Sequence, residues 1–383
     1  YIMSAGNQIE KPRFFIDLLN YQYNIGNVGT ASSQNWGTAN QMGEMHPHTI
    51  GFNATKPYVR SSIAHNATYA YFKVGFKNPI SIQDRPMFVG IFGHDWASRG
   101  FRISTRFHTG GDDWNSPSGA NVTQVQVDIE DIVNGGGGAD VSPEYDGWSL
   151  YKFTPSVTEG ITAVVIKIMD MNGSIPGINF FKLGSFCVGY IYEPEFNADL
   201  GVSQTRIMDG IKNKNTKGGK TYSVINYLRP SNWWTGSPFE LTNPDLISEP
   251  VAFNNARIGR RSWDVGFSQL SDRKYTDGVP NGVFPANEMV GRHLPDTVNG
   301  NYSSDQDYDS ETRKFNYNIN NDVSLYSTVY HHTLGGTLPF LFSPSSDNSP
   351  QNFAVCRFAK PGFKVTEKSY KRLNIKMKIN ESW

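Results

Sequence analysis

Apolar and polar residues alternate with a period of two in many segments of this chain. The segment 101–107, FRISTRF, has mostly apolar residues at odd positions and Arg or Ser at even positions. The segment 373–379, LNIKMKI, alternates in the same way. Successive side chains of a β-strand point to opposite faces, so this pattern predicts strands with one buried and one solvated face. The almost continuous apolar run at 161–169, ITAVVIKIM, predicts a strand covered on both sides.

Helical periodicity is scarce in comparison. Short helices are expected only at 13–22, 196–200 and 324–330. Glycine pairs, among them Gly218-Gly219 and Gly335-Gly336, mark turns between the apolar runs. A chain with many short strands, dense turns and few helices is typical of antiparallel sheet proteins.

A boundary between two domains is expected at Glu193-Pro194. Before it, the segment 181–192, FKLGSFCVGYIY, predicts the closing strand of a first unit. After it comes a more polar stretch with a basic patch, which comprises Lys212, Lys214, Lys217 and Lys220. The predicted fold class is therefore all-β, with two β-sandwich domains of jelly-roll type at residues 1–193 and 194–383 and few short helices.

Composition agrees with this prediction and excludes several functions. The chain has 24 Phe, 19 Tyr and 8 Trp, while only 18% of its residues are charged. Lys plus Arg equals Asp plus Glu at 35 each, and a duplex-DNA binder usually has a basic excess, so no nucleic-acid partner is expected. No apolar run approaches about 18 residues, so no membrane span is expected. The two cysteines, Cys187 and Cys356, predict neither a disulfide framework nor a metal site, and we expect synthesis in a reducing cytoplasm.

No residue pattern predicts catalysis. The HExxH, GxSxG and Walker A motifs are absent. The pair His46/His48 has no obvious third ligand, and the adjacent His331 and His332 would point to opposite faces of a strand. The sequence His94-Asp95 contains parts of a catalytic dyad, but a structural turn is favoured there. We therefore expect no enzyme, no metal and no cofactor.

Two adjacent tryptophans, Trp233 and Trp234, are the strongest candidates for ligand contact. They lie in RPSNWWTGSPF, where Asn and Ser accompany the rings. Sugar rings stack on such aromatic faces while their hydroxyls bond to amides, so a glycan contact is one interpretation. The alternative places one tryptophan in the core and the other against a neighbouring subunit. For the basic patch at 212–220, a solvated loop or an acidic partner protein is favoured over a phosphate ligand.

Three stretches in the second half of the chain contain GGTLPFLFSP, TKGG and GRRSWD, and together they resemble a family of tailed-bacteriophage structural proteins that is common in marine phages. The stretch STVYHHTLGGTLPFLFSPSSDNSPQNFAVCRF and the ending LNIKMKINESW are similar to that family's GGxLPFxFxP turn, QFAxxRF-type strand and KLKIxExW ending. MDGIKNKNTKGGKTYS resembles its DG…TKGG motif, and RIGRRSWDVGFSQLSD its GRRxWDLxFxxLxD motif. The positions carried by these motifs include Gly218, Gly219, Arg260, Arg261, Trp263, Asp264, Gly335, Gly336, Pro339 and Trp383.

The first domain resembles the family more weakly. MFVGIFGHDWASRGFRIS and FFKLGSFCVGYIYEPEFNADL are similar to a family strand and to its closing strand, a pairing found in galactose-binding-like jelly rolls. Asp95-Trp96 replaces the family's Asn-Leu.

The resemblance implies a virion component that is made in the bacterial host. Its place would be the phage tail or baseplate, where it would assemble with itself and with other tail proteins. Alternation in RRSWDVGF puts Trp263, Val265 and Phe267 on one face and points Arg261 and Asp264 away from each other, so the motif residues are expected to be folding determinants.

Two further expectations concern the turn before the C-terminal strands. Gly335-Gly336 should permit positive φ, and Pro339 should stiffen the start of the next strand. Two alternative functions remain open. One is a carbohydrate-binding adhesin that uses Trp233 and Trp234 on a host surface glycan, and the other is a capsid decoration or collar protein.

Overall fold

The structure is a computed structural model of the chain. It describes residues 11–34, 59–61, 69–82, 85–109, 123–127, 130–135, 137–156, 160–170, 181–194, 197–199, 202–207, 211–225, 241, 259–271, 308–309, 314–315, 325–362, 364–369 and 372–382.

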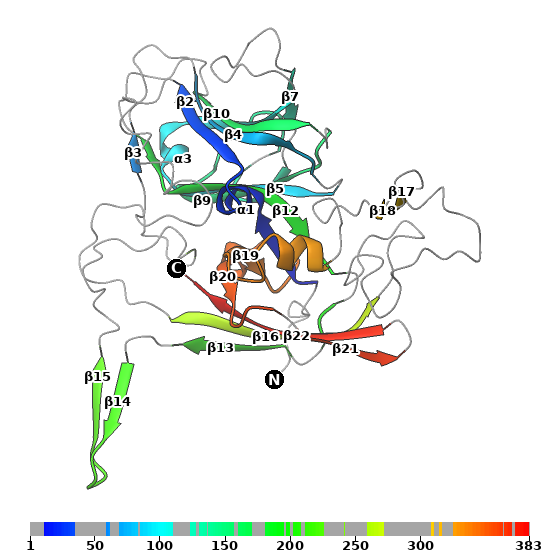
Figure 1. The fold of residues 1–383 in the computed structure, drawn as a ribbon. Helices are drawn as coiled ribbons and strands as arrows, with labels where there is room; N and C mark the ends of the chain where they lie inside the picture. Colours follow the sequence, from blue (N-terminus) through cyan, green and yellow to red (C-terminus); the bar gives the residue numbers. More distant parts are fainter. Residues whose placement is uncertain are drawn as a thin grey trace.

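Antiparallel strands dominate the described chain, which confirms the predicted all-β class (Figure 1). The larger sheet has 11 strands in the order β13-β16-β22-β20-β19-β1-β12-β5-β9-β8, and β21 pairs with β22 outside this path. Its strands are β1 (Arg13–Asp17), β5 (Met87–His94), β8 (Glu130–Val133), β9 (Gly147–Phe153), β12 (Ser185–Tyr192), β13 (Ser203–Ile207), β16 (Arg260–Ser271), β19 (Phe340–Ser343), β20 (Ala354–Phe358), β21 (Lys364–Ser369) and β22 (Arg372–Glu381).

A smaller five-stranded sheet has the order β2-β4-β10-β6-β7. Its strands are β2 (Val28–Gln34), β4 (Tyr69–Ile80), β6 (Phe101–Thr109), β7 (Thr123–Val127) and β10 (Ile161–Asp170). Three further pairs are β3 (Val59–Ser61) with β11 (Phe181–Leu183), β14 (Ile211–Asn215) with β15 (Thr221–Ile225), and β17 (Tyr308–Asp309) with β18 (Lys314–Phe315). The helical segments are α1 (Leu18–Asn24), α3 (Trp96–Arg99), the π-helix η3 (Tyr326–His331) and the 3₁₀-helix η4 (Pro350–Asn352).

The smaller sheet packs on one part of the larger sheet as a sandwich, the upper half of Figure 1. In it, β1-β12-β5-β9 faces β4-β10-β6-β7. When these eight strands are followed along the chain, they pass between the two sheets in the order of a jelly roll. A jelly roll is a sandwich that contains two Greek keys. The run predicted to be covered on both sides is β10, the centre of the smaller sheet, and its adjacent Val164 and Val165 are both buried.

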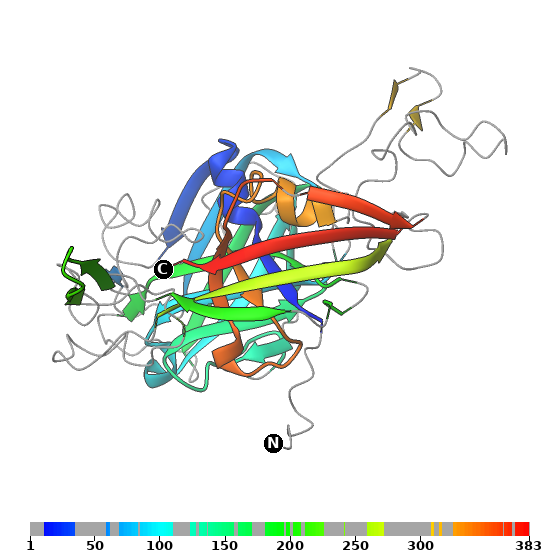
Figure 2. The same cartoon turned by 90° about the horizontal axis from the view of Figure 1, so that it is seen from below.

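A second core lies on the other side of β1. The larger sheet bends there, so that β16 and β22 face β1, β19 and β20 across a cluster that includes Phe14, Trp263, Phe342 and Ile375. The helix η3 contributes Val329 to the same cluster. Figure 2 shows β21, β22, β16 and β13 side by side, in red, yellow-green and green.

The first strand joins the two parts of the molecule. β1 pairs with β12 on one side and with β19 on the other. One continuous sheet therefore runs through chain segments on both sides of Glu193-Pro194, although that dipeptide does lie between β12 and β13. The division at residues 193 and 194 stays a prediction.

The expected helix at 13–22 is wrong in its first half. Residues 13–17 form β1, and all five side chains are buried because the strand is covered on both faces. The helix α1 begins only at Leu18, where the Asp17 carboxylate accepts a hydrogen bond from the Leu19 N–H at 3.0 Å. The expected helix at 324–330 is present as η3 with one preceding helical residue, whereas the described part of 196–200 is not helical.

Candidate functional site

Two of the motif-carrying stretches, 257–272 and 327–383, meet in a buried ion pair. Nη2 of Arg261, on β16, lies 3.0 Å from Oε1 of Glu381, at the end of β22. The side chains are only 5% and 2% exposed, and the residues are 120 positions apart in the chain. The Arg261 backbone N–H also donates to Glu381 Oε2 at 2.7 Å. The KIxExW-like ending and the GRRxWD-like motif are thus complementary halves of one contact.

Arg261 also fixes the loop before β20. Its guanidinium donates to the carbonyl oxygens of Gln351 and Phe353, each at 2.6 Å. It lies 5.1 Å from the ring centre of Trp263, a cation–π distance. The neighbouring Arg260 donates weakly to the Glu381 carbonyl at 3.5 Å. A guanidinium with this many fixed partners is a structural clamp.

The predicted face of β16 is confirmed. Trp263, Val265 and Phe267 are between 1% and 3% exposed and belong to the second core. Asp264 points the other way, where it pairs with Lys378 of β22 at 4.0 Å, with both side chains about half exposed. Arg261 and Asp264 therefore lie on opposite faces, as the alternation predicts.

The predicted turn before β19 also takes the expected form. Gly335 and Gly336 have φ of 72° and 88°, and Leu334 precedes them with φ of 51°. A Cβ on Gly336 would lie 2.9 Å from Cδ2 of Phe358, so this glycine also permits a close approach to the core. Pro339 immediately precedes β19.

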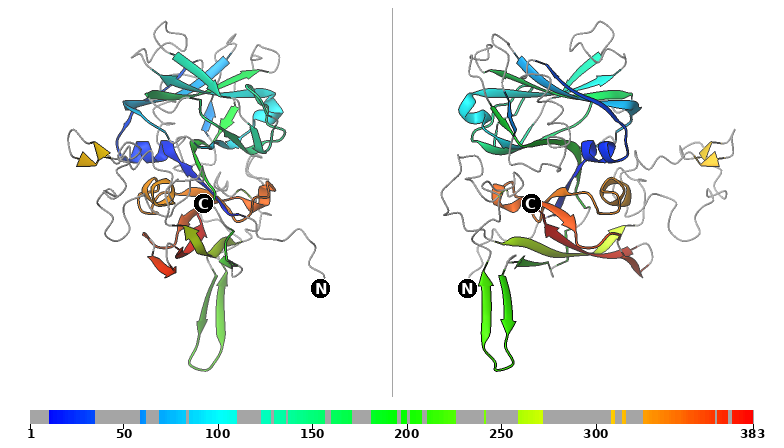
Figure 3. Two further views of the ribbon diagram at one scale, coloured as in Figure 1. Left: turned by 90° about the vertical axis from the view of Figure 1, so that its right-hand side faces the viewer. Right: turned by 60° about the vertical axis from the view of Figure 1, so that its left-hand side comes forward.

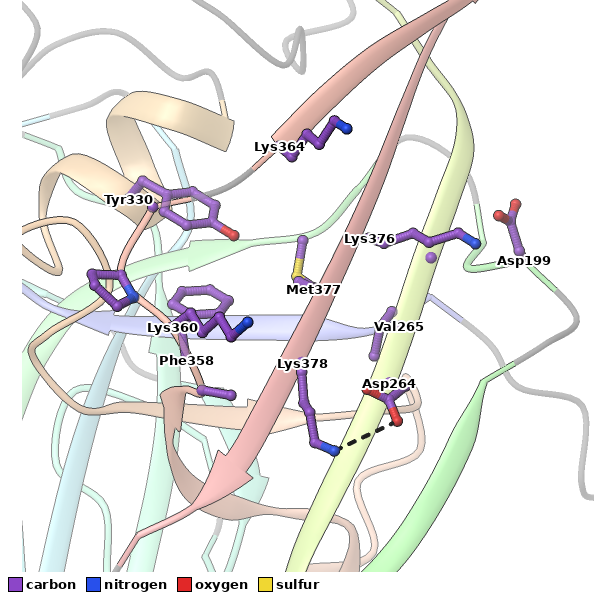
Figure 4. A pocket seen from close by; sticks show the side chains of 14 residues that line it. Asp199, Asp264, Val265, Tyr330, Phe358, Lys360, Lys364, Lys376, Met377 and Lys378 are labelled. Atoms are coloured by element: carbon purple, nitrogen blue, oxygen red, sulfur yellow. Dashed lines mark ion pairs between the residues drawn. The ribbon is translucent and has the colours of Figure 1, made fainter.

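A groove of about 970 Å³ lies beside these motif residues (Figure 4). It is bordered by β16, β22 and the turn between β20 and β21. Its apolar lining includes Phe358, Met377 and Val265, all largely buried. Tyr330 stacks on Phe358 with ring centres 4.7 Å apart, and burial raises the pKa of its hydroxyl, which therefore stays protonated.

Lysines dominate the charged lining of the groove. The set consists of Lys360, Lys364, Lys376 and Lys378. The acidic lining consists of Asp199 and Asp264. Asp199 accepts hydrogen bonds from the Ser268 N–H and hydroxyl at 3.1 and 2.7 Å, so it is held against β16. The charged lining of the groove is therefore net positive. Sequence reasoning missed it because the lysines lie in two stretches, 360–364 and 376–378, which only the pairing with β22 brings together.

The TKGG-like motif forms the turn of an exposed hairpin. Gly218 and Gly219 connect β14 and β15, and Gly219 has φ of 81°. The basic patch predicted at 212–220 is therefore this hairpin, which projects from the body in Figure 3. The tryptophan candidates Trp233 and Trp234, and the motif residue Trp383, lie outside the described residues.

The buried histidines serve the fold. His94 Nε2 lies 2.8 Å from the Ser149 hydroxyl, and burial lowers the His94 pKa to about 4. Asp95 accepts from the Lys182 N–H at 2.7 Å and pairs with Arg99 at 3.3 Å, which favours the structural-turn interpretation of His94-Asp95.

The adjacent His331 and His332 do not lie on a strand, since η3 ends at His331. The His332 Nδ1–H donates to the Ser327 carbonyl at 2.6 Å, and burial lowers the His332 pKa to about 3. Within the described segments, no group of three or more His, Cys, Asp or Glu side chains is placed to hold a metal ion. In the same segments, no helix is long and apolar enough to cross a membrane. Both cysteines are buried and free.

No protein-family model matches the chain, and no curated protein matches it significantly.

Proposed function

We propose that the chain is a structural component of a bacteriophage virion, in the tail or baseplate, where it assembles with itself and with other tail proteins. The observation that carries the proposal is the set of motifs similar to those of tailed-phage structural proteins, at 208–223, 257–272 and 327–383. Such a protein acts by holding a shape and by binding its neighbours, so its characteristic residues are expected at packing, ion-pair and turn positions.

The positions of the described motif residues support this mechanical role. Arg261 is clamped by Glu381, Trp263 fills a core, and Gly335-Gly336 turns the chain against Phe358. Packing, ion-pair and turn positions suit a protein that holds a fixed shape within an assembly.

Two exposed features support binding to neighbours. The first is the projecting hairpin β14–β15, and the second is the lysine-lined groove. Both are cationic and leave their charges at the surface, where a partner with acidic groups gains charge complementarity and specificity.

Quantitative mass spectrometry of gradient-purified virions tests the proposal. The phage that encodes this chain should carry it at a copy number comparable to other tail proteins. Host proteins of similar abundance in the lysate provide the background control. Loss of the chain during purification, while known head and tail proteins persist, would refute the proposal.

A further inference from the structure

The hairpin β14–β15 stands apart from the rest of the described fold. We call residues 211–225 the arm. In Figures 1 and 3 it projects away from the sheets, and all residues from 213 to 223 are exposed. Each strand has five residues, so at about 3.4 Å per residue it extends by about 17 Å. An isolated two-stranded hairpin is only marginally stable in water, so a projecting one gains stability from a partner.

One face of the arm is neutral and satisfies its own hydrogen bonds. The Ser223 hydroxyl donates to Asn213 Oδ1 at 2.7 Å, and the Thr221 hydroxyl donates to Asn215 Oδ1 at 2.8 Å. Both are cross-strand pairs in the register of the hairpin. These contacts fix the hairpin and leave this face with little need for a partner.

The opposite face is cationic and aromatic. Lys214 pairs with Tyr222 across the strands, and the Lys220 Nζ lies 5.2 Å from the Tyr222 ring centre. Tyr222 is 54% exposed, the highest value among the exposed large apolar side chains of the described residues. Lys217 adds a further charge at the turn. Like charges on one strand face repel each other, so this face is stabilised when acidic groups lie against it.

Charge balance indicates what kind of partner fits the arm. The arm contains four lysines and no Asp or Glu. Of the 35 Lys and Arg residues in the chain, 31 therefore lie elsewhere, against all 35 Asp and Glu. The rest of a second copy is thus net acidic by four charges. This acidic excess attracts the cationic arm of another copy. The same excess repels the phosphates of a nucleic acid, so it disfavours a nucleic-acid partner.

An acidic edge, whose charge is opposite to that of the arm, lies at the other end of the larger sheet. The segment 130–152 contains five acidic residues and a single basic residue, Lys152. The acidic residues are Glu130, Asp131, Asp140, Glu144 and Asp146. Glu130 pairs with Lys152 at 2.9 Å.

Within this edge, the carboxylates of Asp131 and Glu144 lie close enough to repel each other. Burial and the nearby Glu144 carboxylate raise the pKa of Asp131 to about 6. Tyr145, which is 41% exposed, lies next to Glu144 and offers an aromatic contact beside the charges.

The positions of the two surfaces favour contact between copies. The arm follows β13, which ends the larger sheet on one side, and the acidic segment begins with β8, which ends it on the other. We infer that the arm of one copy docks on the acidic β8–β9 edge of a second copy of this chain. Because the two surfaces differ, the contact is head-to-tail and generates a ring or an open helix. The inference rests on the proposed self-assembly and specifies the surfaces that form it.

Analytical ultracentrifugation of the full chain over a concentration series tests this contact. The arm variant Lys214→Glu/Lys217→Glu/Lys220→Glu should weaken self-association by at least about 100-fold, because each reversal replaces attraction by repulsion. The variant Lys11→Glu/Lys77→Glu/Lys368→Glu is the matched control, because it reverses three exposed lysines that lie in neither the arm nor the groove, and it should leave self-association unchanged. Superimposable unfolding transitions verify that both variants fold.

A charge swap then tests the acidic edge directly. The variant Asp131→Lys/Asp140→Lys/Glu144→Lys should be monomeric alone, and mixing it with the arm variant should restore association. Added salt should weaken the wild-type assembly.

Three outcomes would overturn the inference: a monomeric wild type, unchanged assembly of the arm variant, or no rescue in the mixture. Binding of the wild-type arm to duplex DNA without self-association would also overturn it. Presence of the chain in purified virions is measured separately, so a failed arm contact and a failed virion assignment are distinguishable.

Discussion

Breaking the buried Arg261–Glu381 pair should destabilise the protein strongly. Glu381→Gln keeps the shape of the side chain but leaves the guanidinium without a counter-charge at a site where Arg261 is 5% exposed. Arg261→Met leaves the carboxylate buried and also removes the donors to Gln351 and Phe353. Removing one partner of a buried pair costs about 3–5 kcal/mol, because the remaining charge is uncompensated. We expect each variant to lose free energy of unfolding in this range.

The structure supplies a matched control on the same two strands. Asp264 and Lys378 are register partners on β16 and β22, 4.0 Å apart, with both side chains about half exposed. Exposed ion pairs contribute about 0–1 kcal/mol, since water screens them and holding both side chains costs entropy. Asp264→Asn should therefore lower the free energy of unfolding by less than about 1 kcal/mol.

Urea unfolding followed by tryptophan fluorescence and circular dichroism measures both effects. Coincident transitions by the two probes justify a two-state free energy. The double variant Arg261→Met/Glu381→Gln should cost less than the sum of the two single variants, because it leaves no unpaired charge. Equal losses for Glu381→Gln and Asp264→Asn, or strict additivity of the double variant, would refute the clamp.

Three further predictions concern the turn and the buried titratable groups. Gly336→Ala should cost more than Gly335→Ala in urea unfolding. Both glycines have positive φ, so an alanine at either position loses about 1 kcal/mol of stability through backbone strain. Only at Gly336 would the added Cβ also clash with Phe358. Equal losses of unfolding free energy for the two variants would contradict this clash. His94 has its pKa lowered from 6.5 to about 4, so the stability it supports is complete above pH 6.5 and falls as pH drops toward 4. Between pH 4 and 6.5, His94→Gln should reduce the slope of the unfolding free energy against pH by about 1.4 kcal/mol per pH unit. An unchanged slope would exclude a buried neutral histidine. Asp17 has its pKa raised from 3.8 to about 7, so its contribution is lost as pH rises through that window. Asp17→Asn keeps a helix cap and should gain stability relative to wild type between pH 4 and 7, and a constant difference would refute the raised pKa.

Local alternation predicted the strands with one wet face, but not the strand that joins the two parts. The faces of β16 and β22 follow directly from a period of two, and Trp263 and Asp264 lie on the predicted sides. The segment 13–17 has no alternation because both of its faces are covered, and its partners on β12 and β19 lie far away in sequence. Only tertiary pairing distinguishes such a strand from a short apolar helix.

The candidate site was predictable only in its local parts. The glycine turn and the basic patch depend on neighbouring residues, so both were visible in the sequence. The partner of Arg261 was not, because Glu381 is 120 residues away and no local rule connects the two. The same holds for the groove, where Lys360 and Lys376 approach each other only through the pairing of β20 and β21 with β22.

Immunogold labelling of intact virions tests the central claim most directly, with a polyclonal antibody raised against the whole purified chain. Virions that lack the chain serve as the control for unspecific binding. The account predicts gold at the tail, concentrated at its distal end, where a baseplate lies. Gold confined to the head or neck would contradict the tail assignment and favour a capsid decoration or collar protein. Virions that carry no label and contain no detectable chain would contradict the structural role itself.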